Sequence, residues 1–318
     1  MELVDIVDAQ NKLSHFIRET KLFKTSLSKN CNLYIKPENL QLTGSFKIRG
    51  AFNKILNLSE EEKSHGVVAC SAGNHAQGVA MASKIAGVKA VVCMPKSAPL
   101  VKINSTKDLG AEVVLVDGVY DDAYEKALEL QEECGYTFVH PFNDEKVIAG
   151  QGTIALEILN ELPNTDAIVC AVGGGGLISG IAYAAKMLKP DIKIYGIQSS
   201  GAPGMYASLA SGYVAKLKKV NTFADGIAVK EVGNLTYDFN QNYVDDILTV
   251  TDEDILEAIK KMLTKEKILS EGAGAASVAA VIKGHIPDLK DSDNVVCVVS
   301  GGNIDLDTLS KIVLEGLD

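Results

Sequence analysis

The sequence predicts an α/β protein with two lobes, each built on an open parallel sheet. From residue 67 onward, short apolar runs alternate with helical patterns, which is typical of parallel sheets covered by helices on both faces. The chain has 318 residues, of which 47% are hydrophobic, enough for a large core. Three glycine-bearing turns directly follow predicted strands, and the carboxyl edge of such sheets is where α/β folds bind ligands.

The beginning of the chain is predicted to hold two helices and one strand. An apolar stripe predicts an amphipathic helix over residues 4–17, and a strand is expected over residues 32–36. Apolar residues at helical spacing then follow Lys47. Thr43 and Ser45 precede them, so we expect these side chains to cap a buried helix whose first turn contains Lys47.

Residues 65–138 are predicted to form a small lobe, because strands and helices alternate there without interruption. The strands are expected at residues 67–70, 90–93, 113–116 and 138–139, and the helices at residues 74–86, 99–109 and 121–133.

Residues 1–64 and 139–318 are predicted to form a larger lobe around a second parallel sheet. The region from residue 198 to residue 245 has few apolar runs and is expected to be irregular. The strands are expected at residues 167–172, 192–197, 247–250 and 295–299, and the helices at residues 146–161, 173–188, from residue 251 and at residues 273–282.

Composition disfavours several classes of protein. The net charge is −10, whereas proteins that bind nucleic-acid backbones carry basic surfaces, so no nucleic-acid partner is expected. No apolar run reaches membrane-spanning length, and the acidic first residues lack the basic start of a secretory signal. The six cysteines form no CxxC pair, which favours free buried thiols over disulfides or a metal site. A cytoplasmic protein without a membrane partner is predicted.

Lys47 is the first candidate for chemistry. Most lysines are solvated surface charges, but this one lies between a glycine-bearing turn and a buried helix. The positive end of the helix dipole and desolvation both disfavour a charged ammonium there. A lysine kept neutral is a nucleophile or a Schiff-base former.

Residues 173–180 (Gly-Gly-Gly-Gly-Leu-Ile-Ser-Gly) follow a predicted strand and open a helix, so their amides form an anion site. The spacing does not match GxGxxG, and the next strand ends in Gln198 where a dinucleotide ribose would want a carboxylate. A Walker loop needs Gly-Lys, a dipeptide that this chain lacks. A phosphate site without a basic side chain remains, since a tight turn alone explains one or two glycines but not four.

Two further polar turns follow strands, at residues 71–78 (Ser-Ala-Gly-Asn-His-Ala-Gln-Gly) and at residues 300–303 (Ser-Gly-Gly-Asn). Taken singly, either turn could be a helix cap with an asparagine in a left-handed conformation. Together with Lys47 and the glycine loop, they indicate one shared ligand site. No HExxH or GxSxG motif and no clustered metal-ligand set occurs, so metalloprotease and α/β-hydrolase functions are disfavoured.

These residues together resemble the pyridoxal-phosphate enzymes of the tryptophan-synthase β fold and, within them, the serine/threonine dehydratase family. TGSFKIRGA, SAGNHAQGVA, VIAGQGT, GGGGLISG, ADG and SGGNID occur in the family's order over essentially the whole chain. The SFKIRG form resembles dehydratases more than cysteine synthases, whose lysine is typically followed by Asp-Arg. Within the dehydratases, the chain most resembles the catabolic threonine ammonia-lyase type.

The resemblance implies a pyridoxal 5'-phosphate site in the large lobe. Lys47 would hold the cofactor as a Schiff base and act as the catalytic base, Asn74 would bond the ring hydroxyl, and Ser300 the ring nitrogen. Residues 173–177 would bind the phosphate, Phe46 would pack beside the ring, and Gly226 and Glu271 would lie behind it. The implied cofactor-binding set is Phe46, Lys47, Asn74, Gly173, Gly174, Gly175, Gly176, Leu177, Gly226, Glu271 and Ser300. The implied substrate-binding set is Ser71, Ala72, Gly73, Asn74 and His75.

By the same resemblance, the reaction is a β-elimination that converts L-threonine to 2-oxobutanoate and ammonia, with L-serine as a secondary substrate. Serine racemase and 3-hydroxyaspartate ammonia-lyase activities stay open as alternatives. The similar racemases carry a serine base where Ala72 stands, and a carboxylate pair for a divalent cation where Gln198 and Gly204 stand. These departures imply one-faced elimination without a metal. From another class, a catalytically idle nucleotide-binding module also stays open.

The implied partners are a small amino-acid substrate and further copies of the chain, as a homodimer or a homotetramer. A nucleotide effector is also compatible with the resemblance. Dehydratases often carry a carboxyl-terminal regulatory domain, and the sequence leaves feedback control open.

Overall fold

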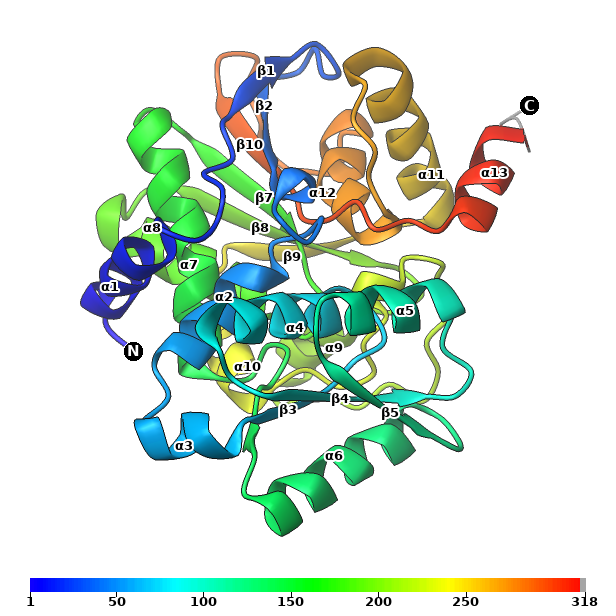
Figure 1. Ribbon diagram of the computed structural model, residues 1–318. Coiled ribbons are helices and arrows are strands. Elements are labelled where there is room, and N and C mark those ends of the chain that lie inside the picture. The colour runs from blue at the N-terminus through cyan, green and yellow to red at the C-terminus, as the bar shows by residue number, and fades with distance from the viewer. Residues whose placement is uncertain (315–318) are drawn as a thin grey trace.

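The computed structural model describes residues 1–314 and contains two sheets, one above the other in Figure 1. The larger has six strands in the order β1-β2-β10-β7-β8-β9. Only the β1–β2 pair is antiparallel, which confirms the predicted α/β class with mainly parallel sheets. Its strands are β1 (Phe23–Thr25), β2 (Asn32–Pro37), β7 (Ala167–Ala171), β8 (Lys193–Ser199), β9 (Asp246–Val250) and β10 (Asn294–Val299).

The smaller sheet has four parallel strands in the order β5-β4-β3-β6. They are β3 (Val67–Cys70), β4 (Ala90–Pro95), β5 (Glu112–Val116) and β6 (Thr137–Phe138). Helix α4 (Asn74–Ala86) covers the face toward the large sheet, beside α5 (Leu100–Asp108), and α6 (Tyr120–Cys134) covers the other face (Figure 1). The division of the chain into domains at residues 65 and 138 stays a prediction.

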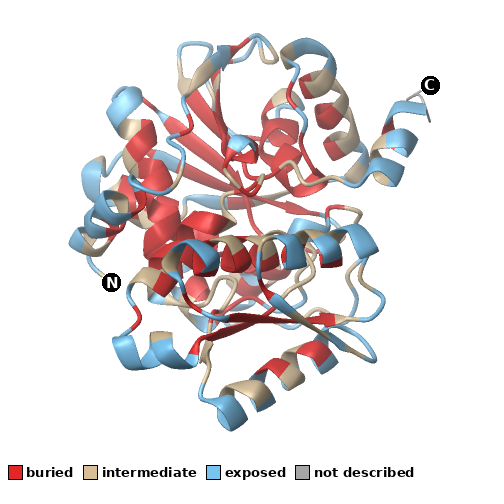
Figure 2. Ribbon diagram, viewed as in Figure 1, coloured by how far each residue is buried: buried red, intermediate tan, exposed pale blue. Residues whose placement is uncertain are grey.

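Buried helices cover both faces of the large sheet (Figure 2). On one face lie α1 (Leu3–Leu13), α7 (Glu145–Glu161), α8 (Gly176–Leu188) and α10 (Asn234–Tyr243); on the other lie α11 (Asp252–Lys261) and α12 (Gly272–Ile282). Helix α2 (Lys47–Leu56) packs its apolar residues into the core of the smaller sheet, so it lies where the two lobes meet.

Two expectations about helices were wrong. The helix expected over residues 4–17 ends at Leu13, and Phe16 instead turns back to pack on Phe52 of α2, with 4.9 Å between ring centroids. The apolar residues beyond Leu13 therefore serve tertiary packing and do not mark a continued helix. The region expected to be irregular contains α9 (Gly204–Ser211) and α10, whose polar sequence is held by buried Thr236 and Asn240.

The remaining described elements are short: η1 (Glu38–Leu40), α3 (Glu60–His65), η2 (Asp225–Ile227), η3 (Met262–Glu266) and α13 (Leu306–Leu314). All six cysteines are free thiols, as predicted, although Cys134 is exposed at the end of α6. Within residues 1–314, no helix combines the length and the apolar character needed to cross a membrane.

A buried network of four charged side chains ties α2 to its surroundings. Arg49 donates to Glu38 of η1 at 2.7 Å and to Glu157 of α7 at 2.6 Å, and Lys36 of β2 reaches Glu157 at 2.5 Å. Glu157 is 6% exposed and the other three side chains are fully buried. Because each charge has opposite partners, the desolvation of the group is offset, and the start of α2 is fixed against α7.

Candidate active site

Lys47 is the first residue of α2, as predicted, and points away from the helix toward Pro141. Its Nζ donates to the Pro141 carbonyl at 2.8 Å and lies 5.2 Å from the centre of the Phe46 ring. Burial lowers the pKa of Lys47 to about 8, a shift that the nearby Glu271 charge opposes. A substantial share of neutral amine is therefore present near physiological pH.

The expected helix cap is absent. Neither Thr43 nor Ser45 bonds an amide of α2, and both hydroxyl oxygens are buried without a hydrogen-bond partner. The chain enters α2 through Gly44 at φ +70, and the Phe46 amide donates to the Ser300 carbonyl at 3.1 Å. This contact with the turn after β10 holds the start of the helix in place of a side-chain cap.

Asn74, at the start of α4, and Glu271, just before α12, are in contact. The Asn74 amide donates to Glu271 Oε1 at 2.6 Å, and Asn303 donates to Asn74 Oδ1 at 2.7 Å. Burial raises the pKa of Glu271 to about 7, and the charge of Asp225 adds to this effect. The turns after β3 and β10 are thus joined through one carboxyl group, as their predicted shared site requires.

The turn after β3 offers backbone donors rather than an imidazole. His75 is buried, its Nε2 lies 2.7 Å from the Val139 carbonyl, and burial lowers the pKa of His75 to about 3. The backbone N–H groups of Asn74 and His75 donate no hydrogen bond to residues 1–314, and the Ser71 hydroxyl accepts from Gly73 N at 3.2 Å. A carboxylate at this helix N-terminus would meet free amides, with Ala72 presenting only a methyl group.

The glycine loop leads into α8 with its backbone donors free. Across the described chain, nothing accepts a hydrogen bond from the five amides of residues 173–177. A Cβ added to Gly174 would lie 2.3 Å from the Phe142 ring, and Gly175 has φ +96, so neither position tolerates a side chain. Thr236 fixes the loop by donating to the Gly174 carbonyl at 2.6 Å. Free amides at the start of a 13-residue helix fit a phosphate group.

The remaining predicted residues connect these parts. A Cβ added to Gly173 would lie 3.2 Å from the Gly226 carbonyl, and one added to Gly226 would lie 3.4 Å from Glu271 Oε1. Ser300 is buried beside Phe46, whereas Leu177 packs into the core beneath the loop. The structure thus brings the predicted cofactor residues to one place, and their individual roles stay predictions.

Three residues contribute to the site without having been predicted from the sequence. Pro141 supplies the carbonyl that Lys47 contacts, Phe142 covers the glycine loop, and Asn303 links Thr43 to Asn74. The dipeptide His140-Pro141 interrupts the alternation of strands and helices, and its sequence alone indicates no contact with Lys47. Asn303 lay inside a motif already singled out, and its place in a glycine turn could have indicated a structural link.

The free amides of the glycine loop and the buried amine of Lys47 fit the phosphate and the aldehyde of pyridoxal phosphate. Comparison with known proteins shows which class of protein this chain belongs to. The chain belongs to the family of pyridoxal-phosphate dependent enzymes, whose profile matches residues 13–301. The expected enzyme class and cofactor are confirmed.

Individual relatives are more specific. The chain is 49% identical to the L-threonine ammonia-lyase of Thermotoga maritima, covering 99% of this chain and 79% of the relative. It is 43% identical to the L-threonine dehydratase catabolic TdcB of Escherichia coli (strain K12), covering 97% and 94%. These relatives confirm the predicted resemblance to the dehydratase family.

Solved structures share the fold over nearly the whole chain. Threonine deaminase isoform 2 from Solanum lycopersicum is 40% identical with a TM-score of 0.94, covering 99% of this chain and 92% of that one. Serine racemase from Dictyostelium discoideum is also 40% identical, with a TM-score of 0.91 and coverage of 96% and 99%.

Proposed function

We propose that this protein is a pyridoxal-phosphate dependent L-threonine ammonia-lyase, which forms 2-oxobutanoate and ammonia and accepts L-serine as a secondary substrate. The observation that carries the proposal is the buried amine of Lys47, with a pKa near 8, in a site that also holds the free amides of residues 173–177. The names of the threonine ammonia-lyase and threonine dehydratase relatives support the substrate.

In this proposal, Lys47 would attach the cofactor, the amides of residues 173–177 would hold its phosphate, and Asn74 and Ser300 would contact its ring. When bound, pyridoxal phosphate supplies a conjugated ring that can take up the electron pair left by removal of the substrate Cα proton. Ser300 would offer the ring nitrogen a hydroxyl instead of a carboxylate, which would favour elimination over transamination.

Lys47 is the proposed base. Its neutral amine would accept the Cα proton of the substrate, and a pKa near 8 keeps that neutral form available. The substrate carboxylate binds the free amides of Asn74 and His75, with the Ser71 hydroxyl beside them. The low pKa of His75 keeps its imidazole neutral, so the carboxylate is held by backbone dipoles rather than by a cation.

Racemase activity is the alternative because two serine racemase structures share the fold at 40% and 35% identity. A racemase needs a second base on the opposite face of the substrate, and Ala72 provides none where the resembling racemases carry serine. Gln198 uses its amide to donate to the Val172 carbonyl at 3.1 Å and to accept from Tyr206 N at 2.9 Å. Gly204 has no side chain, so these positions offer no carboxylate pair.

The test is Lys47→Ala against Lys54→Ala, which removes a lysine from the same helix outside the site. We expect Lys54→Ala to retain the yellow colour of bound cofactor and the release of 2-oxobutanoate, and Lys47→Ala to lose both, with activity falling at least about 10³-fold. L-threonine, L-serine and 3-hydroxyaspartate are compared with and without EDTA, and the products are analysed for D-isomers. A colourless wild type after supplementation, or D-serine as the main product, would overturn the proposal.

Three further properties stay predictions: assembly into a homodimer or homotetramer, binding of a nucleotide effector and a cytoplasmic location. Light scattering on the holoenzyme tests the first, equilibrium binding of AMP tests the second, and cell fractionation tests the third.

A further inference from the structure

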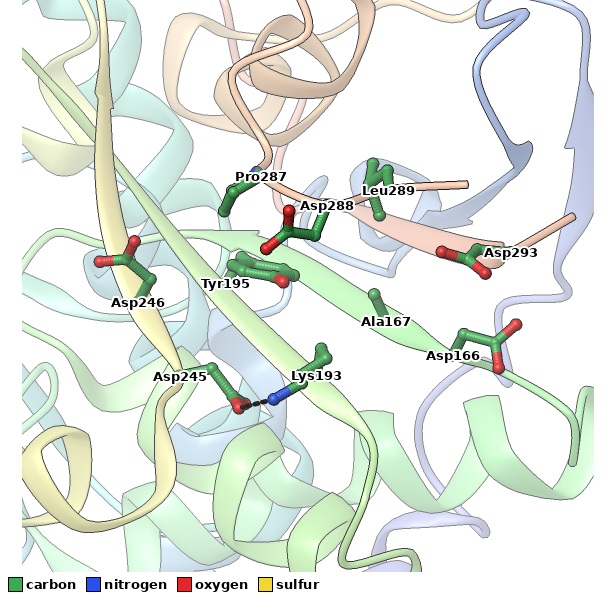
Figure 3. Close-up of a pocket in the computed structure, with 10 residues that line it drawn as sticks. All are labelled: Asp166, Ala167, Lys193, Tyr195, Asp245, Asp246, Pro287, Asp288, Leu289 and Asp293. Atoms are coloured by element: carbon green, nitrogen blue, oxygen red, sulfur yellow. Dashed lines mark hydrogen bonds and ion pairs between the residues drawn. The ribbon is translucent and has the colours of Figure 1, made fainter. Parts of the chain in front are cut away.

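An acidic pocket lies at the edge of the large sheet where β7, β8 and β9 begin, the opposite edge from the glycine loop (Figure 3). Its volume is about 320 Å³, at the small end of the range for small-molecule sites, roughly 300–1,000 Å³. Strand ends form one side, and the loop that follows α12 forms the other. Five carboxylates and one ammonium group line it: Asp166, Asp245, Asp246, Asp288, Asp293 and Lys193.

The negative charge of this pocket is only partly compensated. Asp245 pairs with Lys186 at 2.8 Å and with Lys193 at 3.0 Å. The other four carboxylates form no ion pair with residues 1–314: three accept backbone amides, and Asp288 has no side-chain hydrogen bond at all. Asp288 also has φ +58, a conformation uncommon for residues other than glycine, which aspartate tolerates better than most. The pocket therefore attracts cations.

Tyr195 provides an independent indication of a ligand. It lies on β8 and is 7% exposed, its ring packs into the core of the large sheet, and its side chain lies among the lining residues (Figure 3). Its hydroxyl faces the pocket and has no hydrogen-bond partner within the described chain, so it is available to a ligand. Burial raises the pKa of Tyr195, and the charges of Asp245 and Asp288 add to this effect, so the hydroxyl stays protonated.

The residues that line the pocket favour an organic cation over a metal ion. No three histidine, cysteine or acidic side chains among residues 1–314 come together as a set that could hold a metal ion. The carboxylates are spread around a floor that includes Ala167, Pro287 and Leu289. Separated charges over apolar surface suit ammonium groups joined by methylene chains, and the Tyr195 ring can contact either part.

We propose that this pocket binds an aliphatic diamine or polyamine. Asp288 and Asp246 pair with its ammonium groups, and the Tyr195 hydroxyl accepts a hydrogen bond from one of them. This site is separate from the proposed reaction, so its test does not depend on which amino acid the enzyme consumes.

The holoenzyme is titrated calorimetrically with spermidine, 1,4-diaminobutane and 1-butylamine at one fixed ionic strength. We expect saturable binding of spermidine and 1,4-diaminobutane, and at least about tenfold weaker binding of 1-butylamine, which can form only one charged contact. Added Mg²⁺ at matched ionic strength leaves the affinity unchanged. No saturable heat, equal affinity for the monoamine, or displacement by Mg²⁺ would each overturn the proposal.

Variants locate the site. Asp288→Asn and Asp246→Asn each weaken spermidine binding about five- to tenfold, and Tyr195→Phe, which keeps the ring, weakens it about threefold. Asp8→Asn removes an exposed carboxylate of α1 and leaves binding unchanged. Thermal unfolding confirms that each variant is folded. If Asp8→Asn weakens spermidine binding as much as the pocket variants do, or if neither Asp288→Asn nor Asp246→Asn weakens it, spermidine is attracted diffusely to an acidic surface. Either result would contradict a specific binding site.

Discussion

Lys47 and Glu271 carry opposite charges in one site, and burial moves their pKa values toward each other, to about 8 and about 7. Burial disfavours the charged form of each group. Because the two groups are not directly bonded, the charge of one offsets only part of the pKa shift of the other. Small changes in pH near neutrality therefore change the protonation of both the base and the carboxyl group behind the proposed ring.

The pH dependence of stability is the first prediction. A lysine in the unfolded chain titrates near 10.5, so between pH 8 and 10.5 the unfolded cofactor-free protein binds more protons than the folded one. Stability contributed by Lys47 rises with pH in that window, by about 3 kcal/mol in all. Urea unfolding at pH 7.5, 9 and 10.5 should show this rise in the wild type and in Lys54→Met, and lose it in Lys47→Met. Parallel pH profiles in all three would contradict it.

The second prediction concerns the ring of Phe142 over the glycine loop. Gly174→Ala places a methyl group against that ring, and overpacking costs about 1–3 kcal/mol, so we expect cofactor affinity to fall about tenfold. The double variant Gly174→Ala, Phe142→Ala should recover part of this loss, measured by fluorescence titration with pyridoxal phosphate. Additive losses would show that contact with Phe142 is not the cause.

At the scale of elements, the position of α2 depends on Arg49, which joins it to η1 and α7. The third prediction is that Arg49→Met destabilises the protein by about 3–5 kcal/mol, because it leaves Glu38 and Glu157 buried with fewer partners. Urea unfolding at pH 7 measures it. The matched control is Lys146→Met, whose pair with Asp5 is partly exposed and is worth about 0–1 kcal/mol. A similar small cost for both would contradict a role for the buried network.

The helices and strands differ in how well local sequence patterns predict them. The strands from Val67 to Val116 and the alternating helices were predictable because the apolar runs there are short, regular and bounded by polar turns. Strand β1 has three residues at a sheet edge, too short for a periodic signal. Helix α10 has few apolar residues and is held by contacts such as Asn240 with Ser179, 61 residues away in sequence.

Within the site, the sequence indicated the residues that lie in turns after strands, because parallel strands bring their carboxyl ends together. It could not indicate that Thr43 and Ser45 would fail as caps, since that outcome depends on the turn at residues 300–303 holding Phe46. Nor could it indicate that His75 faces the Val139 carbonyl instead of the open site. Both outcomes depend on contacts between segments far apart in the chain.

At the scale of the whole molecule, one ion pair links the helices beside the small sheet to the large lobe. Lys102 of α5 reaches Asp225 of η2 at 2.5 Å, next to Gly226 and the Glu271 carboxyl. Asp225 is largely exposed, so the pair adds little to global stability.

The fourth prediction is that Lys102→Met and Asp225→Asn each raise the KM for L-threonine about two- to fivefold, with kcat nearly unchanged, because the pair holds the lobes together over the site. The exchange variant Lys102→Asp, Asp225→Lys should restore part of the affinity, and salt should reduce the difference between wild type and single variants. Steady-state kinetics at two ionic strengths measures this. Unchanged KM in both single variants would contradict it.

Gly78 gives the two lobes a fixed point of contact. A Cβ at this position of α4 would lie 3.1 Å from the backbone carbon of Lys47, so the helix of one lobe rests almost directly on the first turn of the other. Because this contact involves the backbone of Lys47 itself, a rotation of the small sheet about it would displace the reactive amine little. Such a rotation could admit substrate without disturbing the placement of the amine.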